Sequence, residues 1–175
     1  MTITGTVPTL SQTVEGFSSA LTASPEAGTI TPKVTTQHQS GTATTVTVQA
    51  GPHNFVIDEP ETLGGANAGA NPVEHLLASL ATCQVITYQV WAAKLGITVE
   101  TLEVDAHGDL DIRGFFGVDD SVPAGFNAIN TTVRISGPES AERYAELSAA
   151  VEAHCPVGDT LTRGVSINTD VEIQP

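Results

Sequence analysis

The chain has 175 residues, of which 40% are hydrophobic, and this is enough for one globular, soluble domain with a core. Its formal charge of −14 comes from 20 acidic and 6 basic residues. So large an acidic excess excludes nucleic acids and anionic membrane surfaces as expected partners, because both carry negative charge themselves.

Residues 1–29 are interpreted as an N-terminal helical extension. Val14, Phe17 and Leu21 have helical spacing, and Pro25 ends the pattern, which predicts one short helix that caps the main domain or packs on a partner. The first residues have neither a basic start nor an apolar run, so we expect no secretory signal and a cytoplasmic protein.

The main domain, residues 30–175, begins with strand-like sequence. GTATTVTVQAG (41–51) is rich in β-branched residues, and HNFVIDEP (53–60) reads as a second strand that its proline ends. ETLGGANAGAN (61–71) follows as a loop. It has no subsequent Gly-Lys-Ser/Thr and no basic residue nearby, so we interpret it as a flexible connection rather than a phosphate-binding cradle.

A long helix is predicted from Pro72 to Leu95. Asn71 is a good N-cap, Pro72 suits the first helical position, and Gly96 suits the residue after the helix. The helix is apolar on nearly every side, which predicts burial on nearly every side. Three polar residues make it too polar for a membrane span: His75, Gln84 and Gln89.

The second half of the chain alternates strands with a helix. We expect a strand or pair of strands over residues 97–114, with a kink near residues 100–101, followed by an exposed loop over 115–126. A further strand over 127–137, a second helix over 138–155 and a closing strand over 164–174 complete the chain. The element order predicts an α+β fold in which a mostly antiparallel sheet packs against two helices.

Two cysteines stand on the apolar faces of the two helices. Cys83 shares a stripe with Leu76, Leu80 and Thr87, and Cys155 ends the stripe of the second helix. The next residue is a proline, which breaks that helix and can start another, so Cys155 would lie at a helix N-terminus. Such a position favours a thiolate. In a reducing compartment these are free or redox-active thiols rather than a permanent disulfide.

Several motifs then carry a family resemblance. DEPETLGGANAGANPVEHLLASLATC, GDLDIRGFFG and CPVGDTL resemble the OsmC/Ohr family, named for osmotically inducible protein C and organic hydroperoxide resistance. The N-terminal extension resembles that of one OsmC-like branch. The resemblance implies an intertwined homodimer, with mostly antiparallel sheets wrapped around long central helices and active sites at the subunit interface.

The resemblance also implies a thiol-dependent peroxidase for organic hydroperoxides. Cys83 would attack the peroxide and become a sulfenic acid, and Cys155 would condense with it to a disulfide. An external dithiol would then reduce the disulfide. No cofactor and no metal ion take part in this chemistry.

The chain departs from the family pattern beside Cys83. Peroxidatic members have a glutamate ten residues before the first cysteine, where this chain has Val73, and an arginine in the N-terminal strands, where this chain has none. Glu74 is the nearest candidate acid, but nine helical residues rotate it away from Cys83, and an acid in the first turn also stabilises the helix itself.

Two other functions remain open from the sequence. His75, His154 and the two cysteines could form a metal site, although their spacing is unlike that of zinc proteins. Alternatively, the protein is a non-catalytic module that binds a small apolar ligand at the dimer interface, with Phe115, Phe116 and Phe126 lining or covering the pocket.

Overall fold

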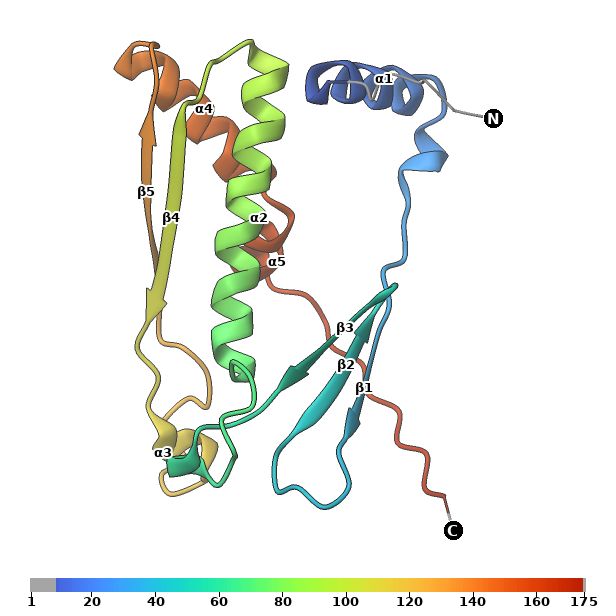
Figure 1. The fold of residues 1–175 in the computed structure, drawn as a ribbon, viewed down its shortest axis with the longest axis vertical. Helices are drawn as coiled ribbons and strands as arrows, with labels where there is room; N and C mark the ends of the chain where they lie inside the picture. The colour runs from blue at the N-terminus through green and yellow to red at the C-terminus, as the bar shows by residue number, and fades with distance from the viewer. Residues whose placement is uncertain (1–8, 175) are drawn as a thin grey trace.

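The computed structural model describes residues 9–174, so residues 1–8 of the predicted extension and Pro175 lie outside it. Two antiparallel sheets and several helices surround one long central helix, α2, as Figure 1 shows. The α+β prediction is confirmed. The elements are α1 (Leu10–Ala23), β1 (Val34–His38), β2 (Val46–Ala50), β3 (His53–Ile57), α2 (Pro72–Leu95), β4 (Thr101–Gly108), α3 (Ile112–Phe115), β5 (Ile129–Ser136), α4 (Ala141–His154) and α5 (Pro156–Arg163), with 3₁₀ turns at Pro25–Gly28 and Glu61–Leu63.

Local capping sets both ends of α2, and the predicted bounds are confirmed. The Asn71 side chain accepts the Glu74 N–H at 2.9 Å, and the Glu74 carboxylate accepts the Asn71 N–H at 2.8 Å, which closes a capping box. At the other end, Gly96 adopts a left-handed conformation with φ 63°, which a residue without a side chain tolerates best.

The core lies between α2, α4 and the β4–β5 sheet. Leu147 is fully buried at 0% exposure, and it packs with Val151, Tyr88, Ala92 and Ile97. Strands β4 and β5 pair antiparallel from Thr101 with Ser136 to Gly108 with Ile129, and every second residue of β4 turns toward the core. Burial of a leucine of this kind contributes about 1.5–3 kcal/mol to stability.

A buried carboxylate organises the loop between β3 and α2. Asp58, at 1% exposure, accepts hydrogen bonds from the Thr44 hydroxyl and from the N–H groups of Glu59, Ala66 and Ala68, at 2.7–3.2 Å. These bonds hold the pKa of Asp58 at about 2, below its model-compound value of 3.8, with the Thr44 bond as the largest cause. The loop N–H groups therefore bind the chain's own carboxylate, which agrees with a connecting loop rather than a phosphate cradle.

Three local predictions are wrong. The first strand region forms three strands, β1 to β3, rather than two. Of residues 97–114, for which the sequence predicts one or two strands, only Thr101–Gly108 forms a strand, and the short helix α3 begins at Ile112. Residues 164–174 form no strand, and Ile173 in that segment is 90% exposed. An extended segment becomes a strand only where it meets a sheet edge, and within the described chain this segment meets none.

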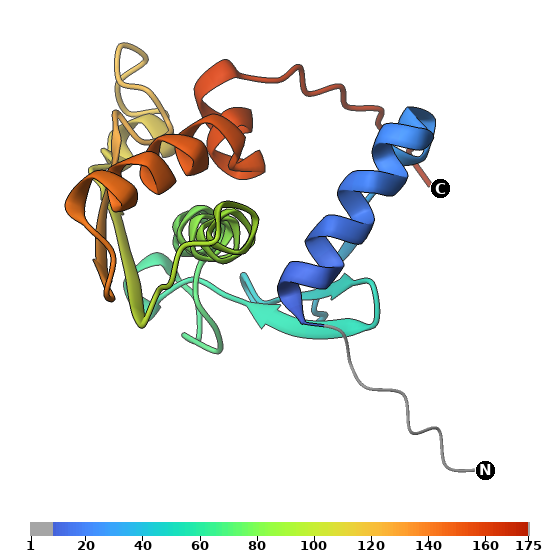
Figure 2. The same cartoon turned by 90° about the horizontal axis from the view of Figure 1, so that it is seen from above.

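Helix α2 is less covered than its sequence predicts. Its length and mean hydropathy of 1.3 suffice for a membrane span, so the three polar residues do not exclude one by composition, and only 22% of its most apolar window is buried. Ile86, for example, is 64% exposed. Figure 2, which looks along α2, shows the arrangement: α4 and β4–β5 gather on one side, and α1 lies on the other, where it lines a depression together with Ala93 and Lys94 of α2.

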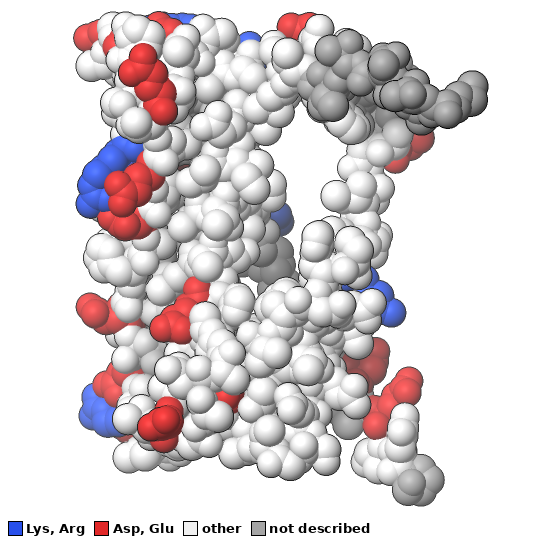
Figure 3. All heavy atoms as spheres, in the orientation of Figure 1, with Lys and Arg blue, Asp and Glu red and all other residues white. Residues whose placement is uncertain are grey.

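Charged side chains are sparse over the middle of the molecule. In the space-filling view, acidic and basic groups lie mainly toward the rim, and the surface over α2 is mostly uncharged (Figure 3). An opening also separates α2 from the chain segment that joins α1 to β1 (Figure 3).

Candidate active site

The two cysteines meet where α2 passes the junction of α4 and α5. Cys155 is the last cap residue of α4 and the N-cap of α5, and Pro156 is the first residue of α5, as the sequence predicts. The Gly158 N–H points at the Cys155 Sγ at 3.5 Å. Cys83 of α2 lies 3.5 Å from Cys155. The structure therefore brings together two free thiols that are 72 positions apart.

The surroundings of Cys83 favour its protonated form. Burial raises the pKa of the Cys83 thiol above its ordinary value, and the neighbouring Cys155 raises it further. The Val157 N–H and the Thr87 hydroxyl act in the opposite direction. In the structure, the Thr87 hydroxyl donates to the Cys83 carbonyl oxygen at 2.7 Å, so it must turn away from that carbonyl before it can donate to a thiolate. The net effect is a thiol that needs a proton acceptor before it can react as a nucleophile.

The two thiols differ in access. Cys155 is buried at 2% exposure, whereas Cys83 is partly exposed and lines a cavity of about 440 Å³. The walls of this cavity come from one face of α2, including Ile86, Val90 and Trp91, and from the α4–α5 junction. A small molecule that enters it meets Cys83 first, and Cys155 lies behind.

A second cavity, of about 480 Å³, lies on the other side of the α4–α5 junction. It is lined by apolar residues that include Leu80, Phe126 and Leu161, and by Gln84, whose buried Oε1 has no hydrogen-bond partner among the described residues. Phe126 thus lines a cavity within one chain, whereas the ligand-binding alternative places it at a pocket of the dimer interface, which stays a prediction. Phe115 and Phe116 instead pack edge to face, with ring centroids 5.0 Å apart, and both are exposed.

Glu74 lies apart from the thiols. Its carboxylate closes the capping box of α2, and it lines a small surface depression with Leu77 and Ala106, residues absent from the lining of the Cys83 cavity. Val73 lies beside it in the first turn of α2. A role for Glu74 in this site stays a prediction.

Three arginines outside the N-terminal strands are candidates to replace the missing cation, but each is engaged elsewhere. Arg113 pairs with Asp111 at 2.6 Å, Arg143 donates to the Leu95 carbonyl at 2.9 Å, and Arg163 pairs with Asp159 at 2.8 Å. No Lys or Arg appears among the described residues that line the Cys83 cavity. These arginines are surface ion-pair partners, which contribute little to stability.

The histidines do not assemble into a metal centre with the cysteines. Within residues 9–174, no group of three or more His, Cys, Asp or Glu side chains has the geometry to hold a metal ion. His75 packs on Phe55 of β3 with ring centroids 5.3 Å apart, whereas His154 packs on Trp91 at 4.2 Å. The two histidines therefore pack against aromatic residues in different parts of the molecule.

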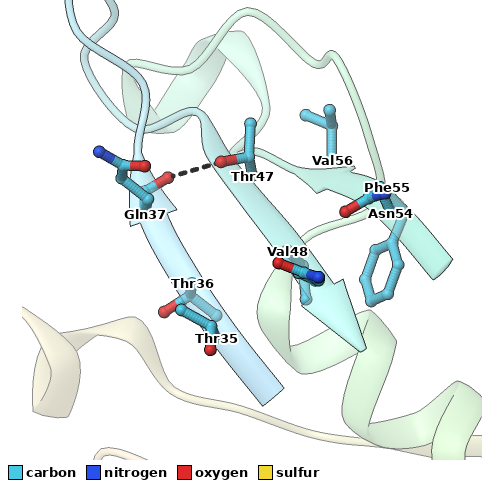
Figure 4. Close-up of a pocket in the computed structure, with 9 residues that line it drawn as sticks. Thr35, Thr36, Gln37, Thr47, Val48, Asn54, Phe55 and Val56 are labelled. Atoms are coloured by element: carbon cyan, nitrogen blue, oxygen red, sulfur yellow. Dashed lines mark hydrogen bonds between the residues drawn. The ribbon is translucent and has the colours of Figure 1, made fainter. Parts of the chain in front are cut away.

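Another depression, of about 430 Å³, lies on the β1–β2–β3 sheet (Figure 4). Its side chains are polar or apolar but uncharged, among them Thr35, Asn54 and Phe55, and the Thr47 hydroxyl donates to the Gln37 carbonyl at 3.2 Å (Figure 4). The described residues that line it include no thiol, carboxylate or imidazole, so they offer no group for acid–base or nucleophilic chemistry.

Sequence reasoning found some of the groups that surround the thiols but not their contacts. Thr87 follows Cys83 by one helical turn, so its place on the Cys83 stripe could be predicted from spacing. The contacts of Val157 and of His154 depend on how α4 and α5 cross α2, and no local signal predicts them.

Comparison with known proteins agrees with this architecture. A family model described as OsmC-like protein matches residues 64–170, which is more than half of the chain, so the protein belongs to the OsmC-like family. The segment before residue 64 lies outside that match. A curated relative, the uncharacterized protein YmaD of Bacillus subtilis (strain 168), is 31% identical over 71 residues, covering 40% of this chain and 47% of the relative. The match thus spans about half the length of that relative.

Solved structures show the same fold at low identity. An OsmC-like protein from Mycoplasma pneumoniae has a TM-score of 0.65 at 22% identity, over 76% of this chain and 88% of that one. An organic hydroperoxide resistance protein from Elizabethkingia anophelis has a TM-score of 0.58 at 21% identity, over 78% and 90%. At these identities the likeness establishes the fold.

Proposed function

We propose that the protein is a cytoplasmic, thiol-dependent peroxidase that reduces organic hydroperoxides, with Cys83 peroxidatic and Cys155 resolving. The observation that carries the proposal is the contact between a partly exposed Cys83 and a buried Cys155. The names of similar structures, which include hydroperoxide resistance proteins, support it. Neither a cofactor nor a metal ion is needed.

The chemistry proceeds in three steps. The Cys83 thiolate attacks the terminal peroxide oxygen, so an S–O bond forms, the O–O bond breaks, and the alcohol leaves once its oxygen is protonated. The Cys155 thiol then attacks the Cys83 sulfur, which forms the disulfide and releases water. An external dithiol reduces this disulfide by exchange. The difference in access assigns the roles, because the peroxide meets Cys83 first.

We further propose that the active form is an intertwined homodimer. Exposed apolar residues on α2 and on the C-terminal segment, such as Ile86 at 64% and Ile173 at 90%, are the kind of surface that a subunit interface covers. A second copy whose sheet edge accepts residues 164–174 would turn that segment into the closing strand. The same contact would cover α2, which removes the reason to place this helix in a membrane.

Peroxide-dependent loss of thiols tests the catalytic proposal. The reduced protein is treated with cumene hydroperoxide, and free thiols are counted over time. We expect rapid loss of two thiols per chain. Cys83→Ser should abolish the loss, whereas the matched variant Cys155→Ser should lose one thiol and hold a sulfenic acid that dimedone traps. Unchanged thiol counts in the parent protein would contradict the proposal.

A second candidate is a non-catalytic module that binds an apolar ligand. The raised pKa of Cys83 and the cavity lined by Leu80, Phe126 and Gln84 favour it. In native mass spectrometry, an apolar ligand that stays bound in Cys83→Ser but is lost in Phe126→Ala would support this function.

A further inference from the structure

The proposed reaction needs a group that moves protons. Cys83 is held as a thiol by burial, so its proton must leave before attack, and the departing alkoxide must gain one. Cys83 and His154 are the only titratable side chains among the described residues that line the cavity. The site therefore offers one imidazole and one thiol, contributed by different helices, to the same small space.

The orientation of His154 is defined by two contacts. Its Nδ1 lies 2.7 Å from the Ala150 carbonyl oxygen, one turn earlier on α4. A carbonyl oxygen can only accept, so Nδ1 carries the hydrogen, and Nε2 keeps the free lone pair of the neutral ring. The ring also packs against Trp91 of α2, with centroids 4.2 Å apart and planes at 36°. These contacts select one tautomer whose open nitrogen can accept a proton.

The elements packed around His154 bring few charges to it. From α2, Lys94 places its Nζ 4.3 Å from the centroid of the same Trp91 ring, and Cys83 lies along the cavity. From α5, the lining residues Pro156 and Val157 carry no charge. No carboxylate appears among the described lining residues, so none is present there to hold the imidazolium in an ion pair.

We propose that His154 is a catalytic residue that carries the proton between Cys83 and the leaving oxygen. Its Nε2 accepts the proton of the Cys83 thiol through water in the cavity that both residues line, and the thiolate attacks the terminal peroxide oxygen. The imidazolium then returns that proton to the alkoxide, so thiol and hydroperoxide become sulfenic acid and alcohol with no net proton change. This inference rests on the proposed peroxidase function.

A proton-carrying role of His154 accounts for the departures from the family pattern beside Cys83. The resemblance implies an arginine and a glutamate at this site, and the chain lacks both at the matching positions. An arginine would stabilise the thiolate as a permanent cation. A histidine achieves the same end by removing the proton, and therefore makes the reactivity of Cys83 depend on pH over the range in which the imidazole titrates.

The test is the pH profile of Cys83 reactivity in His154→Asn. Asparagine keeps a side-chain N–H for the Ala150 carbonyl and removes the titratable nitrogen. The rates of Cys83 alkylation by iodoacetamide and of thiol oxidation by cumene hydroperoxide are measured from about pH 5 to 8, in a Cys155→Ser background that leaves one thiol. His75→Asn, which alters a histidine of α2 that is absent from the lining of the cavity, is the matched control.

We expect His154→Asn to lower the oxidation rate at about pH 7 by about 10²-fold and to abolish the rise in alkylation rate that accompanies imidazole deprotonation. His75→Asn should keep both. If His154→Asn retains the parent pH profile, the proposal is overturned. Because alkylation needs no peroxide, a protein that alkylates as expected but does not reduce hydroperoxide would contradict the peroxidase function and leave the proton transfer supported.

A second measurement does not depend on how the variant folds. The imidazole C–H resonances of His154 are followed by NMR against pH in the Cys155→Ser protein, before and after Cys83 is alkylated with iodoacetamide. Proton exchange between the two groups predicts that alkylation shifts the midpoint of the His154 titration. An identical midpoint would overturn the proposal.

Discussion

The two sides of α2 differ in how completely the chain covers them. On one side, α4 and the β4–β5 sheet bury Leu147 and Val151 at 0% and 2% exposure. On the other side, apolar residues of α1 and of the C-terminal segment are exposed: Phe17 at 66% and Ile167 at 88%. The first side is a finished core. The second has the composition of a core but lacks the layer that would cover it, which is expected of a subunit that completes its fold with a second copy.

The site lies at the border between these two sides. Cys155 belongs to the finished core, whereas Cys83 lines a cavity whose α2 wall continues into exposed residues such as Ile86. A partner that covers this wall would narrow the cavity and exclude water from the thiol. The proposed dimer and the proposed peroxidase therefore depend on the same surface of α2.

The largest expected effect is in the finished core. Leu147→Ala removes a fully buried side chain and leaves a void, so we expect the free energy of unfolding to fall by about 2–5 kcal/mol in denaturant titrations. Val118→Ala, at a residue that is 73% exposed, is the control and should change stability by no more than about 0.5 kcal/mol. Equal losses in the two variants would contradict the position of the core.

The next effect concerns the uncovered side. Ile167 and Ile173 share one face of the extended C-terminal segment, because they are separated by an even number of residues. The double variant Ile167→Asp and Ile173→Asp should weaken dimerisation by at least about tenfold, because it would bury charge in the interface. Sedimentation over a dilution series measures this, with Val118→Asp as the control. Unchanged dimerisation would remove this segment from the interface.

The loop between the two sides depends on the Asp58 carboxylate. Because the pKa of Asp58 is lowered to about 2, its ionised form stabilises the fold above a pH of about 3.8, and this contribution is lost as pH falls through about 2. Asp58→Asn should therefore lower the melting temperature at neutral pH, and the difference from the parent protein should shrink between about pH 4 and pH 2.

Thermal unfolding at several pH values measures this prediction. Asp120→Asn, at an exposed aspartate, is the control. A difference between Asp58→Asn and the parent that is constant with pH would show that the carboxylate charge is not what holds the loop.

The smallest effect is a single hydrogen bond within the finished core. The Tyr88 hydroxyl lies 2.9 Å from the Ser148 hydroxyl and joins α2 to α4. Tyr88→Phe keeps the ring and removes this bond, so we expect a loss of about 0.5–1.5 kcal/mol. Ser148→Ala removes the same bond from the other side, and the double variant should cost less than the sum of the two single variants. Additive losses would show that the bond does not form in solution.

Several features could be predicted because their causes are local. The bounds of α2 follow from Asn71, Pro72 and Gly96, and the start of α5 follows from Pro156, since caps and prolines act within one turn of the residues that carry them. The helix of the extension, α1, follows in the same way from the spacing of its apolar residues. The two cysteines could be singled out because Cys83 lies within the apolar stripe of one helix and Cys155 ends the apolar stripe of another.

Other features were decided only by the tertiary structure, because they depend on groups that are far apart in the chain. The contact of Cys83 with Cys155, the direction of the Cys83 pKa and the packing of His154 on Trp91 all require α4 and α5 to cross α2. The closing strand fails within one chain for the same kind of reason: β-branched residues at 164–174 favour an extended backbone, but a strand also needs an edge to pair with. Sequence patterns describe what a segment can form by itself, whereas burial, proton affinity and strand pairing belong to the neighbours that the fold supplies.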